Sequence, residues 1–281
     1  MKVGNSRVLY HDREADSAAQ ADSMGHPALD LTNKTAVVIG GTSGIGLALA
    51  KGLAQAGANV VPTGRRTALV ESAAAEIEGL GRRSLAVASD VTDRGTLERL
   101  YEAVSNEFGG VEILVNSAGI TRRTPISELA ESEWQAILDT NLTGTLRACQ
   151  VFGRNMIEQG YGRIINIASL ASFVGMFEVA AYSASKAAVA SLTKSLAVEW
   201  ARFGVCVNAI APGVFRTELN SGLLNGTPRA EEFLMRTPMR RFGELDELVG
   251  AAVFLASDAA SFVTGHLLVV DGGFLASGVN R

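Results

Sequence analysis

Ser169, Tyr182 and Lys186 have the types and the spacing that acid–base chemistry needs. Tyr182 and Lys186 are four positions apart in a run typical of a helix, so their side chains share one face. A cation beside a phenol favours the phenolate and lowers a pKa that is about 10 in free tyrosine. The spacing therefore predicts that Tyr182 exchanges a proton near neutral pH. A chance pair on an amphipathic helix has the same spacing, so the rest of the chain must decide.

The composition is typical of one globular domain of enzyme size. The chain has 281 residues, 47% hydrophobic and 19% charged, with a formal net charge of −4. It contains no long basic run, so neither nucleic acid nor an anionic membrane surface is expected as a partner. Cys149 and Cys206 are far apart and the histidines form no cluster, so we expect no metal site. The start lacks the apolar run of a signal peptide, which predicts a cytoplasmic protein.

Short apolar segments alternate with amphipathic ones from residue 34 onward. Helices are predicted at 47–55, 97–108, 136–156 and 180–202, and buried strands at 35–39, 60–61, 84–88, 111–116, 163–168, 205–210 and 267–270. The alternation predicts the α/β class: a single Rossmann-like, doubly wound parallel sheet with helices on both faces. We assign it to residues 31–281. Residues 1–30 are polar with little to pack, and we expect a flexible tail.

A glycine-rich turn follows the first predicted strand, where doubly wound sheets bind ligands. Gly40 permits a tight turn, Gly44 lets the backbone approach a pyrophosphate, and Gly46 lets helix and strand pack closely. The turn predicts a dinucleotide site, although glycines alone also occur in plain turns. The residues expected to bind the cofactor here are Gly40, Thr42, Ser43, Gly44, Ile45 and Gly46.

The end of the second strand determines which dinucleotide is expected. An acid there would bind the ribose hydroxyl of NAD, whereas this chain has Arg65 and Arg66. Guanidinium groups pair with a phosphate dianion through charge-assisted hydrogen bonds. We therefore predict NADP rather than NAD, unless these arginines are merely solvated charges at the start of a helix.

Taken together, these motifs resemble the short-chain dehydrogenase/reductase family over nearly all of residues 31–277. The chain departs from the family pattern at Ile39, where a threonine is usual, and at Ser117, where the family has a second asparagine. Both departures lie outside the catalytic set. The runs 119–123 and 270–276 resemble the gluconate 5-dehydrogenase and 2-deoxygluconate dehydrogenase branch of that family.

The resemblance implies further roles. Asn141 would complete a catalytic set with Ser169, Tyr182 and Lys186 by holding a water in a proton relay behind the lysine. Tyr182 and Lys186 would also contact the cofactor. The other cofactor contacts that the resemblance implies are Asp90, Val91, Asn116, Ala118, Gly119, Pro212, Gly213, Val214 and Thr217. Each has an ordinary alternative, such as a helix cap for Asp90 or a plain turn at Pro212.

The assembled parts predict hydride transfer between a nicotinamide and a carbonyl or alcohol carbon. Tyr182 would donate the proton as general acid, and Ser169 would hydrogen-bond the same substrate oxygen. Ser169, Tyr182, Arg122 and Met176 are the expected substrate contacts. Arg122 and Arg123 are the candidate cations for a substrate carboxylate, with solvated loop charges as the alternative. A mobile lid is expected at about 215–240.

Three functions remain open from the sequence. The first is an NADP-dependent oxidoreductase acting on a sugar acid such as gluconate, and the second is a 3-oxoacyl carrier-protein reductase with the same motifs. The third is an NADP-sensing regulator without chemistry, which the intact catalytic set disfavours. Helices 136–156 and 180–202 are apolar on more than one face, with Leu192, Leu196 and Val198 as examples. We therefore expect a homo-oligomer, and the resemblance implies a homotetramer.

Overall fold

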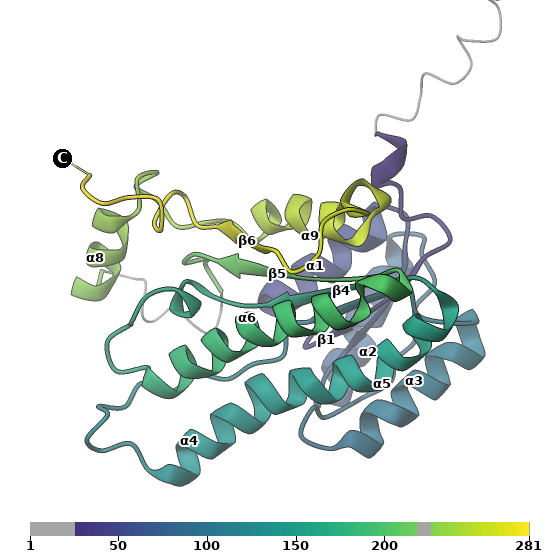
Figure 1. Cartoon of the computed structure of the whole chain (residues 1–281), viewed down its shortest axis with the longest axis horizontal. Helices are drawn as coiled ribbons and strands as arrows, with labels where there is room; N and C mark the ends of the chain where they lie inside the picture. The colour runs from purple at the N-terminus through teal and green to yellow at the C-terminus, as the bar shows by residue number, and fades with distance from the viewer. Residues whose placement is uncertain (1–25, 218–225, 281) are drawn as a thin grey trace, which may run out of the picture.

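The computed structural model describes residues 26–217 and 226–280. Its centre is one parallel sheet in the order β2-β1-β3-β4-β5-β6 (Figure 1). The chain passes from β1 outward to β2 and then crosses to β3 on the other side of β1, so the predicted doubly wound sheet is confirmed. The strands are β1 (Thr35–Ile39), β2 (Asn59–Thr63), β3 (Ile113–Asn116), β4 (Gly162–Ile167), β5 (Val205–Pro212) and β6 (Leu267–Val270).

The strand predicted at 84–88 is wrong. This segment runs beside β2 and joins it by backbone hydrogen bonds only near its two ends, from Val60 to the Arg83 carbonyl and from Ser89 to the Gly64 carbonyl. Between them side chains replace the ladder: Ser84 Oγ donates to the Val60 carbonyl at 2.7 Å. β2 is therefore the edge strand of the sheet. Where a seventh strand was expected, the Ser84 hydroxyl satisfies an outward-facing carbonyl of β2.

Helices cover both faces of the sheet (Figure 1). Neighbouring residues of β1 point to opposite faces: Val38 packs into the core beneath α1 and α9, and Val37 into the core beneath α3, α5 and α6. Side chains fill both cores. A binding site is therefore expected in the loops at the strand ends. The helices are α1 (Gly44–Gln55), α2 (Thr67–Gly79), α3 (Arg94–Phe108), α4 (Glu131–Leu138), α5 (Gly144–Gln159), α6 (Ala180–Trp200), α8 (Pro228–Arg236) and α9 (Val249–Ala256).

The helix predicted over 136–156 is three consecutive pieces. A π-helical turn, η2 (Asp139–Thr143), separates α4 from α5. Insertions of this kind occur most often at functional sites, since they turn one residue out of the regular helical register. The residue at the centre of this turn is Asn141.

The apolar residues chosen on α6 have different environments. Leu196 is 7% exposed and Leu192 packs against the same core, so these two side chains fill the interior. Val198 is 83% exposed. Of the three residues on which the sequence argument for assembly was based, Val198 is the one that is exposed.

The expected tail and lid lie partly outside the described residues. A short 3-10 helix, η1 (Pro27–Leu29), precedes the sheet. Of the lid, residues 218–225 are outside the description and 228–236 form α8, which lies beyond the carboxyl ends of the strands (Figure 1). Mobility of the lid stays a prediction. No helix in the described part of the chain has the length and apolarity to cross a membrane.

Candidate active site

Ser169, Tyr182 and Lys186 meet at the carboxyl end of β4. Ser169 begins the short helix η3 (Leu170–Ser172), and Tyr182 and Lys186 lie in the first two turns of α6. Ser169 shares a hydrogen bond with the Tyr182 phenol. Lys186 Nζ donates to the carbonyl of Ile167 at 2.6 Å and lies 5.8 Å from the centre of the tyrosine ring. The predicted convergence of the three side chains is present.

The pKa of Tyr182 differs from the sequence expectation. Burial raises it, and the hydrogen bond from Ser169 lowers it by less. Lys186 is itself almost fully buried, and burial lowers its pKa from 10.5 to about 8. The ammonium is directed at Ile167 rather than at the phenolic oxygen, so the expected lowering by Lys186 is wrong for the protein alone.

Asn141 is fully buried beneath these groups. Its Oδ1 accepts from the backbone N–H of Ile120 at 2.8 Å, and its Nδ2 donates to the Ile120 carbonyl at 2.9 Å. Nδ2 also donates to Ser185 Oγ at 3.0 Å, on the turn of α6 that carries Lys186. The π turn thus allows one amide to tie the loop after β3 to the catalytic helix. Its role in a proton relay stays a proposal.

The glycine turn forms a cradle that has no room for a side chain at Gly40 or Gly46. Gly40 has φ +76°, and a Cβ there would lie 2.6 Å from the backbone nitrogen of Ala118. A Cβ on Gly46 would overlap the Gly40 carbonyl, while Gly44 is open except for Thr217 at 3.7 Å. Ser43 caps α1 without a side-chain capping bond, which leaves its hydroxyl for a ligand. This backbone fits a pyrophosphate at the start of α1.

The expected cofactor contacts Asp90, Val91, Asn116 and Ala118 border the same edge of the sheet. One carboxylate oxygen of Asp90 accepts from Thr92, whereas the cap of α3 is Asp93, so the helix-cap alternative for Asp90 is wrong. Val91, Asn116 and Ala118 border a void too narrow for a water molecule. The buried Oδ1 of Asn116 has no hydrogen-bond partner.

Arg65 and Arg66 follow β2 and are both exposed. Among the described residues, no carboxylate pairs with either guanidinium. A Cβ on Gly64 would lie 3.2 Å from Thr42 Oγ1, so this strand end and the glycine turn are in contact. The two cations stand where a 2′-phosphate would fit.

The loop after β5 closes the cradle from the other side. Gly213 donates to the Val270 carbonyl at 2.8 Å, and a Cβ on Gly213 would lie 2.7 Å from the Asp271 Cα. The Pro212-Gly213 pair is therefore a tight junction with β6 rather than a loose turn. Val214 packs on Phe242, and Thr217 reaches Gly44. The residues present fit a dinucleotide lying across the ends of β1 to β5.

Comparison with known proteins decides the family. Residues 40–275 match the family model described as enoyl-(acyl carrier protein) reductase. The structure aligns with that of a short-chain type dehydrogenase/reductase from Mycobacterium marinum at a TM-score of 0.85 and 36% identity, covering 89% of this chain and 98% of that one. This chain belongs to the short-chain dehydrogenase/reductase family. It is accordingly a nicotinamide-dependent oxidoreductase that acts on CH–OH groups.

Several similar members of the family have named activities. The chain is 41% identical to gluconate 5-dehydrogenase of Gluconobacter oxydans, covering 90% of this chain and 100% of that protein. It is 43% identical to 2-dehydro-3-deoxy-D-gluconate 5-dehydrogenase of Bacillus subtilis (89% and 98% covered) and 42% identical to D-threitol dehydrogenase of Mycolicibacterium smegmatis (87% and 94%). A gluconate 5-dehydrogenase from Burkholderia cenocepacia, solved with NADP and tartrate, aligns at a TM-score of 0.86 and 38% identity (89% and 98%).

The expected substrate residues are not equally placed in this dehydrogenase/reductase. Met176 is half-buried in the loop between Ser169 and Tyr182. The side chain of Arg122 is 70% exposed, and its ion pair with Glu133 is long, at 4.0 Å. Arg122 therefore resembles a solvated charge, which was the alternative interpretation from the sequence. Its neighbour Arg123 instead pairs with Glu178 at 2.5 Å, on the wall of the site.

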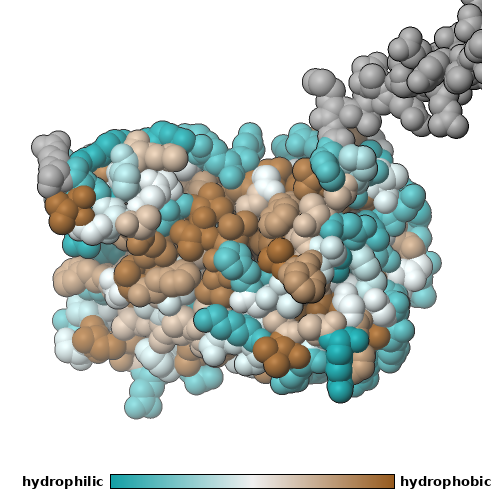
Figure 2. Space-filling view, turned by 45° about the horizontal axis from the view of Figure 1, so that its top comes forward, coloured by the Kyte–Doolittle hydropathy of each residue, from teal (hydrophilic) through white to brown (hydrophobic). Residues whose placement is uncertain are grey.

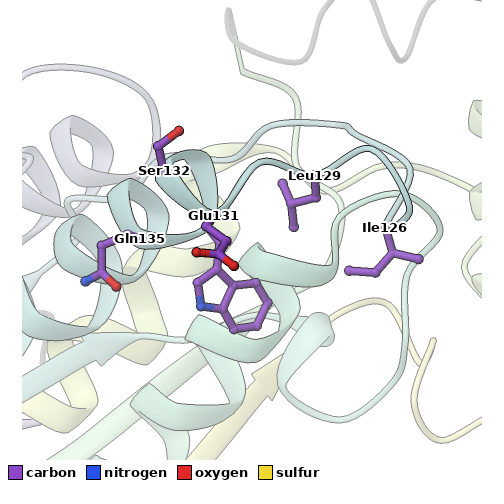
Figure 3. Close-up of a pocket in the computed structure, with 6 residues that line it drawn as sticks. Ile126, Leu129, Glu131, Ser132 and Gln135 are labelled. Atoms are coloured by element: carbon purple, nitrogen blue, oxygen red, sulfur yellow. The ribbon is translucent and has the colours of Figure 1, made fainter.

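One hollow on the described surface is separate from the catalytic groups. It lies between the loop before α4 and the first turns of that helix, and none of the catalytic four borders it (Figure 3). Ile126, Leu129 and Trp134 make its apolar part, with Glu131, Ser132 and Gln135 beside them. The active site is therefore located by the positions and chemistry of the catalytic side chains, and not by this hollow.

Sequence reasoning missed several supporting residues. Ser185 lies inside the Tyr182–Lys186 run, and its spacing from Asn141 gave no signal that the two would meet. Asn166 accepts from Asn116 and donates to Thr193, which links β3, β4 and α6 through a buried chain. Such partners come from strands that are distant in sequence, so single-chain patterns cannot reveal them.

Proposed function

We propose that this chain is an NADP-dependent oxidoreductase that interconverts a secondary alcohol and a ketone in a sugar acid such as gluconate. The observation that carries the chemistry is the meeting of Ser169, the Tyr182 phenol and Lys186 at the end of β4. The sugar-acid class is supported by the named activities of the relatives and by the NADP and tartrate of the Burkholderia structure.

Each catalytic residue has a part that its position explains. The bound nicotinamide supplies or accepts the hydride. Ser169 hydrogen-bonds the substrate oxygen, on which negative charge grows during reduction, and Tyr182 gives that oxygen a proton. The high pKa of the buried phenol keeps this proton available at neutral pH. Oxidation reverses these steps.

Lys186 serves the site through its charge and its place in α6. Because burial brings its pKa to about 8, it can exchange a proton near neutral pH. Asn141 fixes the position of α6 through Ser185 and the position of the loop after β3 through Ile120. Through these contacts, Asn141 supports the proposed proton relay behind Lys186.

The preference for NADP over NAD rests on Arg65 and Arg66. Both guanidinium groups are exposed at the end of β2, and charge-assisted hydrogen bonds to a phosphate are worth roughly 1.5 to 3 kcal/mol each. One such bond corresponds to a preference of about tenfold to a hundredfold. Three of the neighbouring solved structures contain NADP, which supports this choice.

Assembly into a homotetramer belongs to the same proposal. Hydrophobic side chains gather across the middle of one face of the molecule (Figure 2). Large apolar residues are exposed elsewhere on the described surface too, including Phe262 at 102% and Val198 at 83%. Patches of this kind mark association surfaces. We expect light scattering at micromolar concentration to give a mass of several chains, and a stable monomer would contradict the assembly.

A substrate panel tests the function. Sugar acids, neutral polyols and acetoacetyl thioesters are supplied with NADP(H) or NAD(H), and nicotinamide absorbance is followed. We expect the highest kcat/KM for a sugar acid with NADP(H). Efficient reduction of the thioester in preference to sugar acids would instead establish the 3-oxoacyl carrier-protein reductase.

A further inference from the structure

The loop between Ser169 and Tyr182 is held in a strained conformation at Glu178. This residue has φ +61°, a value that side chains other than glycine rarely adopt. Its carbonyl accepts from the Thr124 N–H at 2.8 Å, and its carboxylate pairs with Arg123 at 2.5 Å. The loop that borders the catalytic tyrosine is thereby fixed to the loop after β3. Strain of this kind persists where surrounding contacts over-determine it, which is common at ligand sites.

The first turn of α8 contacts the same loop from the opposite side. Arg229 Nη1 donates to the carbonyl of Phe177 at 3.0 Å. Its Nε is buried and has no hydrogen-bond partner. Arg229 thereby borders the loop between Ser169 and Tyr182, on a helix that lies beyond the carboxyl ends of the strands (Figure 1).

The charges on this wall do not balance. Arg123 and Arg229 share a single close carboxylate, that of Glu178. Burial and then repulsion from Arg123 lower the pKa of Arg229, while Glu178 and Glu232 act in the opposite direction. Glu232 is itself paired with Arg236 at 3.0 Å. Among the described residues, one positive charge is therefore left over beside the catalytic loop. A carboxylate is the group that planar guanidinium donors match best.

We propose that Arg229, with Arg123 beside it, binds the carboxylate of the substrate and so makes this enzyme select sugar acids over neutral polyols. The inference rests on the proposed function, because it concerns the substrate of the same reaction. It moves the anion site from Arg122, which is mostly solvated, to α8. Glu178 holds Arg123 in place and limits the surplus to one charge, which suits a monocarboxylate.

The test compares D-gluconate with xylitol, a neutral polyol, in the NADP-linked reaction. In Arg229→Gln the kcat/KM for gluconate should fall by about tenfold to a hundredfold, the loss expected for one charged hydrogen bond. Xylitol should change by less than about twofold. Arg154→Gln is the matched control, since it removes an exposed guanidinium from α5 that takes no part in these contacts, and it should leave both values unchanged. Equal losses on both substrates, or no loss on gluconate, would overturn the proposal.

Wild-type protein provides a readout that needs no variant. Butyrate, a monocarboxylate with no CH–OH carbon to oxidise, should inhibit xylitol oxidation competitively, and absence of inhibition would overturn the proposal. Failure of the two claims is distinguishable. NADP-linked turnover of gluconate that Arg229→Gln leaves unchanged would remove this inference and leave the proposed function intact. No NADP-linked turnover with any of these substrates would remove the proposed function itself.

Discussion

At the scale of single residues, the chemistry depends on three polar groups, of which Lys186 is buried and Ser169 and Tyr182 are half-buried. Burial raises the pKa of Tyr182 and lowers that of Lys186, so both groups are held in their neutral forms more than they would be in water. The sequence predicted which residues meet, since a four-residue spacing fixes a helix face. It did not predict the sign of the phenol shift, because that depends on how far the fold removes Tyr182 from water.

Replacement of the phenol tests its role as acid. Tyr182→Phe removes one oxygen and keeps the ring, so the fold and cofactor binding should remain nearly intact. Turnover should fall by about 10² to 10⁴, the usual contribution of a positioned acid. Steady-state kinetics on a verified substrate measures the loss, and retention of more than about half of the activity would exclude Tyr182. Lys186→Met should weaken cofactor binding as well as turnover.

The buried lysine predicts a pH dependence of stability. Between its folded pKa of about 8 and its ordinary value of 10.5, the folded chain releases the Lys186 proton while the unfolded chain keeps it. The unfolded state then binds more protons, so the free energy of unfolding rises with pH. From about pH 7.5 to about pH 9.5 the gain should be about 2 kcal/mol. Urea unfolding of the wild type and of Lys186→Met measures it, and parallel pH curves would contradict it.

At the scale of elements, loops at the strand ends bring distant segments together. The glycine turn after β1, the arginines after β2 and the Pro-Gly junction after β5 all follow from motif and strand order, and the sequence placed them correctly on one edge. The π turn at Asn141 and the replacement of a strand at 84–88 were not predictable. Both depend on side chains bonding to backbone groups of other elements, as Ser84 does with Val60.

The glycine cradle gives an element-scale prediction. In Gly46→Ala the new methyl group would overlap the Gly40 carbonyl and displace the turn from α1. We expect NADP affinity to fall at least tenfold, as measured by titration of cofactor fluorescence. Gly79→Ala is the control, because that helical position has no atom within 4 Å of a new Cβ. It should keep the affinity and stabilise the fold by about 0.5–1 kcal/mol. Equal affinities in the two variants would contradict the cradle.

At the scale of the whole molecule, fold and reaction class were predictable and substrate choice was not. Strand alternation and ordered motifs fix the sheet and the catalytic edge. The proposed substrate wall joins Arg123, Glu178 and Arg229, three residues from loops and helices that no local pattern connects. A single amino-acid sequence therefore predicts the reaction class better than it predicts the substrate.

The most direct measurement is the initial rate of gluconate oxidation with NADP⁺ and with NAD⁺ at equal low concentrations. The account predicts that NADP⁺ is reduced about tenfold to a hundredfold faster, because in the proposal Arg65 and Arg66 pair with the 2′-phosphate. Gly64→Asp combined with Arg65→Ser should reverse the order, since a carboxylate accepts from a ribose hydroxyl and repels a phosphate. Faster reduction of NAD⁺ by the wild type, or no gluconate-dependent reduction of either cofactor, would contradict the central claim.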